Sequence, residues 1–133
     1  KSASVAREEA RAENRLAEFL IGTDAPAGSG GQPNGMLRMA TLRASFGGLP
    51  AEQAWCCGSG NVAKRRGLTQ GIVAPGRPAD LVFMDRPGGS PGEDVLGAMA
   101  MGNIPGVAAV MIDGKMRTGR SRSTPPSARV PVI

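Results

Sequence analysis

In the first half of the chain, apolar residues recur every three to four positions, as they do in amphipathic helices. One stretch breaks this spacing: residues 19–23 (FLIGT) are almost continuously apolar and are followed directly by Asp24. A short run of this kind is typical of a strand covered on both faces in a parallel α/β sheet. We therefore predict a strand at residues 19–23. Helices are predicted at residues 4–18, 36–46, 51–57 and 61–66.

The second half of the chain has the pattern of β-strands. Asp113-Gly114, between two apolar stretches, is a strong hairpin signal. Strands are predicted at residues 71–73, 79–85, 107–112 and 115–117, with one helix at 93–101. The last residues are punctuated by proline and show no period. These changes of pattern divide the chain into an α/β part (1–68), a β-rich part (69–120) and a C-terminal tail (121–133).

The composition excludes several kinds of catalytic site. The 133 residues include 20 glycines and 11 prolines but no histidine. This chain alone therefore cannot build a Ser-His-Asp triad, a Cys-His pair or a histidine metal site, and catalysis must use carboxylates or groups supplied from elsewhere. The two cysteines, Cys56 and Cys57, are adjacent, which suits neither a disulfide framework nor a zinc site. We expect a reducing, cytoplasmic compartment.

The net charge of +5 is concentrated near the C-terminal end, where residues 113–133 contain five basic residues and one acidic residue. Nucleic acid is not predicted as a partner, because only Trp55 and three phenylalanines are available to stack on bases. We instead expect the tail to pack on a neighbouring subunit. The longest apolar runs are too short to cross a bilayer, and the charged first residues do not have the layout of a signal peptide. No membrane association is predicted.

Several motifs resemble the C-terminal part of the amidohydrolase superfamily. Residues 71–82 (GIVAPGRPADLV) are similar to its C-terminal signature, and the sequence Asp-Gly-Lys at 113–115 follows at the expected place. Residues 60–68 are similar to the helix before that signature, and residues 19–24 to the eighth barrel strand with its terminal aspartate. The resemblance implies an α/β fold, with the last strand–helix units of a (β/α)8 TIM barrel and the C-terminal part of a small β-sandwich. A whole barrel needs about 250 residues, so a missing N-terminal part or a companion chain would complete it.

Within the superfamily, residues 24–30, 102–106 and 121–126 are most similar to cyclic amidohydrolases of the enamidase type. This resemblance implies hydrolysis of a ring C–N amide bond with the help of a divalent metal, for which zinc is expected and whose other ligands lie outside this chain. It also implies a small cyclic amide as substrate and a homo-oligomer, such as a tetramer. Two alternatives stay open. One is another amidohydrolase, imidazolonepropionase-like or dipeptidase-like; the other is a non-catalytic assembly or binding module.

Asp24 is the main candidate for a catalytic residue. From the residues alone, a carboxylate before Ala25-Pro26 is better explained as a turn or helix cap. The resemblance instead assigns it to the catalytic end of a barrel strand. There it would contact the metal and pass a proton from water to the leaving nitrogen. Ser29 and Gly30, in the glycine-rich loop that follows, are weaker candidates for contacting substrate.

The other conspicuous polar or reactive residues are interpreted structurally. Cys56 and Cys57 lie on a predicted helix and are expected to be small core residues. Asp80 and Asp85 bracket a predicted strand and are expected to accept hydrogen bonds in the turns at its two ends.

Overall fold

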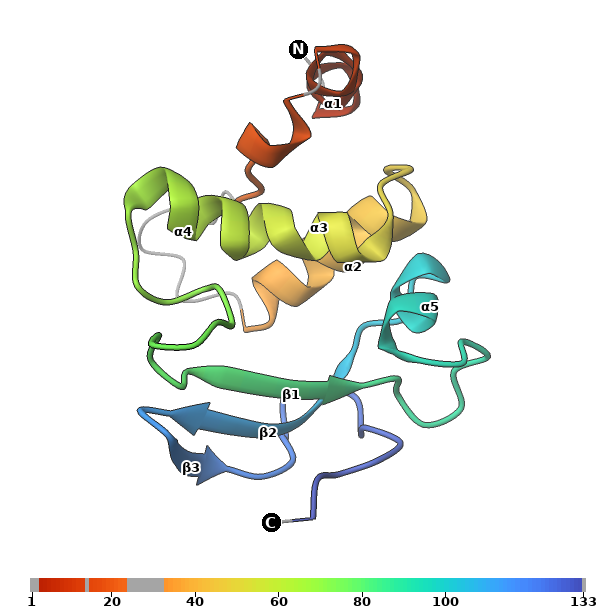
Figure 1. The fold of residues 1–133 in the computed structure, drawn as a ribbon. Helices are drawn as coiled ribbons and strands as arrows, with labels where there is room; N and C mark the ends of the chain where they lie inside the picture. Colours follow the sequence, from red (N-terminus) through yellow and green to blue (C-terminus); the bar gives the residue numbers. More distant parts are fainter. Residues whose placement is uncertain (1–2, 14, 24–32, 133) are drawn as a thin grey trace.

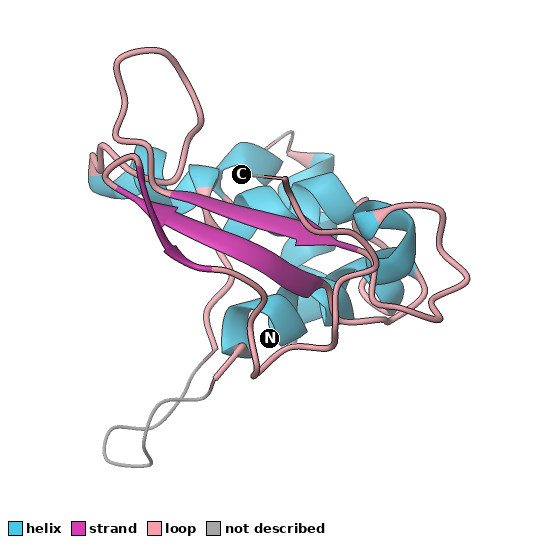
Figure 2. Ribbon diagram, turned by 90° about the horizontal axis from the view of Figure 1, so that it is seen from below, coloured by secondary structure: helices cyan, strands magenta, loops and turns pink. Residues whose placement is uncertain are grey.

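The structure is a computed structural model that describes residues 3–13, 15–23 and 33–132. Helices lie above a small antiparallel sheet, with α1 and the end of the chain at opposite extremes (Figure 1). Seen from below, the three strands cross the face of the helical layer (Figure 2). In chain order, the elements are α1 (Ala3–Ala12), the 3-10 helix η1 (Leu16–Glu18), α2 (Gly35–Ser45), α3 (Ala51–Gly58), α4 (Gly60–Arg66), β1 (Leu81–Asp85), α5 (Val95–Ala100), β2 (Gly106–Ile112) and β3 (Lys115–Thr118).

The N-terminal region differs from the prediction in two ways. The helix expected at 4–18 is broken: α1 ends at Ala12, the Arg15 N–H reaches back five residues to Ala10 O (2.6 Å), and a single 3-10 turn follows. The prediction of a strand at 19–23 is wrong for this structure, in which these residues join no ladder. A strand needs neighbours with which to exchange backbone hydrogen bonds. No strand lies beside residues 19–23 in the described part of the chain.

Helices α2, α3 and α5 pack together through small side chains. Ala40 of α2 and Ala51 of α3 are 1% and 6% exposed, and they form one cluster with Met99 of α5. Alanines at a helix contact allow the axes to come close, and the larger Met99 fills the remaining space. Helix α5 is two residues shorter at its start, and one at its end, than the predicted helix at 93–101. It follows β1 in the sequence and yet belongs to the helical layer.

Helices α3 and α4 run almost end to end and are separated by Ser59 alone (Figure 1). The Ser59 hydroxyl donates to Trp55 O (3.0 Å), one turn back. A Cβ on the preceding Gly58 would lie 2.5 Å from Cε of Met36, which is the far end of a flexible side chain and can move aside. The predicted helices at 36–46, 51–57 and 61–66 are thus confirmed to within a residue or two at their ends.

The sheet has the strand order β1-β2-β3 and is antiparallel throughout. The hairpin between β2 and β3 is confirmed: Asp113 (φ 52°) and Gly114 (φ 69°) both have the positive φ that a type I′ turn requires. Asp80 accepts the Asp113 N–H at Oδ1 (2.9 Å), as expected for a turn carboxylate. The prediction of a strand at 71–73 is wrong. Gly71 has φ 85°, and these residues form bends in the connection from α4 to β1.

Residues 121–129, called here the C-terminal strap, fold back along the sheet to the end of β1. The Ser121 N–H donates to Val107 O (2.9 Å), and the Val107 N–H donates to Thr124 Oγ1 (3.0 Å). Further along, the Ala128 N–H donates to Arg86 O (2.9 Å). The strap therefore packs on the chain's own sheet, and contact of the tail with a neighbouring subunit stays a prediction. The Thr124 hydroxyl thereby satisfies a backbone N–H of the sheet, a role that periodicity does not reveal.

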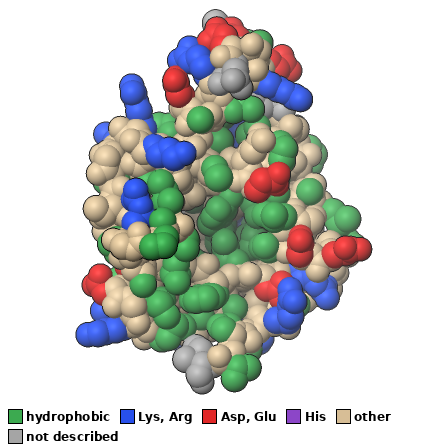
Figure 3. All heavy atoms as spheres, viewed as in Figure 1, with side chains coloured by type: hydrophobic (Ala, Val, Ile, Leu, Met, Phe, Trp, Pro, Cys, Tyr) green, Lys and Arg blue, Asp and Glu red, His purple; other side chains and the backbone are tan. Residues whose placement is uncertain are grey.

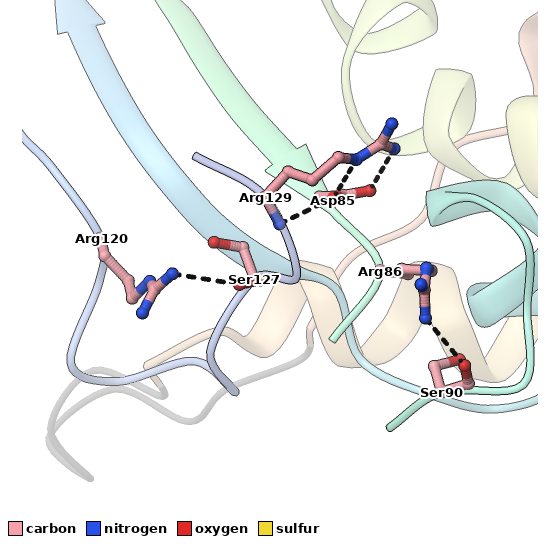
Figure 4. Close-up of polar contacts among 6 residues, drawn as sticks. All are labelled: Asp85, Arg86, Ser90, Arg120, Ser127 and Arg129. Atoms are coloured by element: carbon pink, nitrogen blue, oxygen red, sulfur yellow. Dashed lines mark hydrogen bonds and ion pairs between the residues drawn. The ribbon is translucent and has the colours of Figure 1, made fainter. Parts of the chain in front are cut away.

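The strap ends in an ion pair with Asp85, the last residue of β1 (Figure 4). Arg129 donates from Nε to Oδ2 (2.8 Å), from Nη2 to Oδ1 (2.9 Å), and from its backbone N–H to Oδ2 (3.0 Å). These hydrogen bonds hold the pKa of Asp85 well below its ordinary value, although burial of the carboxylate acts in the opposite direction. The expectation that Asp85 accepts hydrogen bonds is confirmed, but its partner lies 44 residues away.

Candidate functional site

The three site residues predicted from the sequence lie outside the described residues. Asp24, Ser29 and Gly30 all fall within 24–32. The structure describes the chain on both sides of this interval, residues 16–23 before it and residues 33–35 after it.

Before the interval, the chain is anchored to α3. The Ile21 N–H donates to Cys57 O (3.1 Å) at the end of that helix. The Ile21 side chain is 8% exposed and packs with buried residues of the helical layer. These residues are Leu49, Ala54 and Cys57, with Leu16, Phe19, Met36, Met39 and Ala44 around them. One hydrogen bond and one apolar cluster thus fix the chain three residues before Asp24.

A second anchor comes from α4. Asn61 is 8% exposed, and its Nδ2 donates to Leu16 O (3.1 Å) and to Phe19 O (3.0 Å). The sequence pattern predicts a helix at Asn61 but no contact for its side chain. The sequence held only a weak signal, because asparagine is a poor helix former and lies here inside the helix, after its N-cap Ser59.

After the interval, the chain enters α2 through Asn34, which adopts a left-handed conformation (φ 63°, ψ 16°). This residue is the N-cap of α2, but its side chain makes no hydrogen bond to the helix. Its Nδ2 donates instead to Ser123 O in the strap. The start of α2 is therefore connected to the sheet region through the strap.

The thiols and carboxylates of the described residues form no metal site. No group of three or more His, Cys, Asp or Glu residues comes together in this part of the chain. Cys57 is a core residue as expected, whereas Cys56 is exposed, so the expectation that both are core residues is wrong for Cys56. Burial raises the pKa of the Cys57 thiol, with a smaller contribution from Cys56. A buried thiol with a raised pKa is poorly suited to act as a nucleophile.

An apolar hollow lies between the helical layer and the sheet. One part, of about 390 Å³, extends from Trp55 past Ile72 to Leu81 and Val82. A second part, of about 590 Å³, reaches from Trp55 and Val82 to the strap. The space-filling view shows hydrophobic side chains gathered around this hollow (Figure 3).

Among the described helices, none is long and apolar enough to cross a membrane.

Comparison with known proteins places this arrangement in a family. The model of the amidohydrolase family matches residues 2–117, which is most of the chain. The chain belongs to the amidohydrolase family. The resemblance carried by residues 19–24, 60–68 and 71–82 is thereby confirmed.

A curated relative and a solved structure agree with this assignment. Enamidase from Eubacterium barkeri is 41% identical over all 133 residues, which correspond to 34% of the enamidase sequence. The crystal structure of enamidase, described as a new member of the amidohydrolase superfamily, matches with a TM-score of 0.89. That match covers 96% of this chain and 33% of the enamidase chain. The mixed α/β fold is that of this amidohydrolase relative, and the chain spans about a third of the relative's length.

Proposed function

We propose that this chain is the C-terminal portion of a metal-dependent cyclic amidohydrolase that hydrolyses a ring C–N bond, as an enamidase-type enzyme does. The observation that carries the proposal is the similarity to enamidase over the entire chain, at 41% identity and a TM-score of 0.89. In this proposal, residues 19–23, which join no ladder in the described structure, would pair with strands of the missing part and complete a TIM barrel. The sheet with its strap is part of a small β-sandwich completed by another part of the protein.

Asp24 is the residue proposed to act in the reaction. It would follow the last barrel strand at the catalytic end, take the proton of the attacking water and deliver it to the ring nitrogen as the C–N bond breaks. For an enamide ring, the products are a carboxylate and an enamine, and a second water converts the enamine to an aldehyde and ammonia. Ser29 and Gly30 are proposed to contact the substrate.

A divalent metal, zinc in this proposal, supplies a Lewis acid to the carbonyl group when it is bound. The described residues do not by themselves fit such a centre, because they contain no cluster of ligands. Asp24 is the proposed ligand from this chain, and the remaining ligands would come from the missing N-terminal part or from a companion chain. This origin agrees with the absence of histidine from the sequence.

The surface of the chain supports its being part of a larger fold. Val73 and Val82, which line the hollow, are 85% and 51% exposed. Exposed apolar side chains that border a hollow indicate a surface that another part of the protein covers. A self-sufficient binding module would not be expected to leave such a surface open. The proposed assembly of the full-length protein is a homo-oligomer, such as a tetramer.

The decisive experiment is turnover of cyclic amides by the full-length protein with Asp24→Asn and Asp24→Ala substitutions. Loss of a positioned general acid–base group is expected to lower kcat by about 10²- to 10⁴-fold. The matched control is Glu52→Gln, which removes an exposed carboxylate from α3 and is expected to leave turnover unchanged. Retained turnover and unchanged metal content after Asp24→Ala would overturn the role of Asp24.

A substrate panel distinguishes the remaining alternatives. It should contain an enamide lactam, an imidazolone ring and a dipeptide. A preference for the lactam supports the enamidase-type reaction, whereas a preference for the imidazolone or the dipeptide replaces it by another amidohydrolase reaction. A monodisperse, folded 133-residue chain that binds a partner without metal would favour the assembly or binding module.

A further inference from the structure

The strongest unassigned feature is the buried amide of Asn61. An amide nitrogen carries two N–H donors, and Nδ2 of Asn61 donates to two backbone carbonyls, Leu16 O and Phe19 O. These carbonyls lie at the start of the 3-10 turn η1 and directly after its end. A single side-chain group therefore holds both ends of the turn that leads toward Asp24.

The described structure holds this segment without a strand ladder. Residues 19–23 are held by Asn61, by the Ile21–Cys57 hydrogen bond and by the packing of Phe19 and Ile21 on the apolar cluster. Asn61 does not serve as the cap of its own helix, because Ser59 occupies that position. The side chain also contacts Sγ of Cys57 (3.9 Å), so it lies where α3, α4 and the segment meet.

We propose that Asn61 is a positioning residue for the proposed reaction: it fixes residues 16–23 on the end of the helical layer and so determines where the chain presents Asp24. This inference rests on the function proposed above for Asp24. Asn61 touches no reacting atom and acts through the direction of the backbone. A displacement of about 1 Å in a catalytic group can reduce turnover by about 10²-fold without abolishing substrate binding.

The test uses the full-length protein with Asn61→Ala, Asn61→Ser and Asn61→Asp substitutions, followed by hydrogen exchange and steady-state kinetics. Asn61→Ala removes both donors, and exchange of the Phe19–Thr23 amides should rise by about tenfold or more. The expected kinetic signature is a fall of about 10²-fold in kcat with KM changed less than threefold. Asn61→Ser keeps one donor, so its exchange rates and kcat should lie between those of the unmodified protein and those of Asn61→Ala. It also provides the test if Asn61→Ala does not fold.

Asn61→Asp makes the same anchor sensitive to pH, whereas the fall in kcat with little change in KM is the readout that a purely structural role would not give. The introduced carboxylate faces two carbonyl oxygens, and burial among acceptors raises its pKa. Lowering the pH protonates it and restores one donor, so protection of Phe19–Thr23 should partly return. The control is Asn103→Asp in the turn after α5, which makes the same charge change away from this segment and should leave both the exchange and the kinetics unchanged.

Two results would overturn the proposal: unchanged exchange of Phe19–Thr23 in Asn61→Ala or Asn61→Ser, or increased exchange with unchanged kcat. Failure of the proposed function is recognised separately. In that case the unmodified protein, loaded with zinc, would hydrolyse no cyclic amide of the panel. The exchange measurements would still support or overturn the anchoring of residues 16–23 by Asn61, because they do not require activity.

Discussion

Two irregular segments of this chain are fixed to regular structure in contrasting ways. Residues 16–23 are held on the helical layer by the buried amide of Asn61 and by the apolar side chain of Ile21. The C-terminal strap, residues 121–129, is held on the sheet by backbone hydrogen bonds and by the Arg129–Asp85 ion pair. Asn61 is 8% exposed, whereas the ion pair joins a buried carboxylate, with the Asp85 side chain 9% exposed, to an Arg129 side chain that is 75% exposed.

The difference in burial has a physical consequence. A neutral buried amide and a buried side chain keep their contribution to stability over a wide range of pH and salt. An ion pair with one exposed partner is partly screened by salt and is lost when its carboxylate is protonated. The segment that leads to the proposed catalytic aspartate is therefore held by interactions that are insensitive to pH, and the strap by interactions that are partly sensitive to it.

The largest effect is expected from Ile21→Ala in the full-length protein. Removing a buried isoleucine side chain costs about 2–4 kcal/mol through lost burial and the cavity left behind. Hydrogen exchange should then increase in residues 16–23 and leave the strap unaffected. The matched control Ile21→Val should cost only about 1 kcal/mol. Equal effects of the two substitutions would show that the apolar cluster does not hold this segment.

A smaller effect, confined to the strap, is expected from Gly106→Ala. A Cβ at this position would lie 2.5 Å from Ser127 N and 2.7 Å from Pro125 O, both backbone atoms that cannot move independently of the strap. The cost should be about 1–3 kcal/mol, measured as a lower midpoint of chemical denaturation together with faster proteolysis of the strap. Gly119→Ala is the control, since a Cβ there meets nothing within 4 Å. Equal sensitivity of the two variants would contradict the close seating of the strap.

The smallest effect is expected from Asp85→Asn, which tests the pH dependence directly. The folded-state pKa of Asp85 is depressed, so the pair stabilises the protein above the ordinary carboxyl pKa of about 4. This contribution is lost as the pH falls below that value toward the depressed pKa. Asp85→Asn should remove this part of the acid sensitivity and make the strap equally accessible to protease at pH 6 and pH 3.5. Glu93→Gln, at an exposed position before α5, should retain the sensitivity. An unchanged acid response in Asp85→Asn would show that the pair does not hold the strap.

Local pattern predicted the elements that depend on neighbouring residues. The helices α2, α3 and α4 are confirmed because their apolar spacing and terminating glycines act within a few residues. The hairpin at Asp113-Gly114 is confirmed because its φ angles are determined by two residues alone. The error at 19–23 occurs where a strand depends on partners that the described chain does not provide, and the error at 71–73 occurs where Gly71, with φ 85°, turns the chain.

The candidate site likewise contains residues that the sequence indicates and residues that only the structure shows. Asp24 was selected by its position after an apolar run and by the family resemblance, both of which are present in the sequence. Asn61 and Arg129 were not selected, because their partners lie 42–45 residues away and no local pattern indicates such pairs. The exposure of Cys56 was also missed, because two adjacent helical residues point in directions about 100° apart and only one of them can face the core.

The sequence by itself determined the family, the helical and hairpin segments and the absence of histidine from this chain, because these depend on residue identity and short-range spacing. Only the tertiary structure decided that the strap packs on its own sheet, that Asn61 holds the chain before Asp24 and that an apolar hollow separates the two layers. Each of these features depends on which distant segments meet. Which segments meet is determined by the packing of the whole chain and by the need to pair its buried polar groups. No single stretch of sequence carries that information.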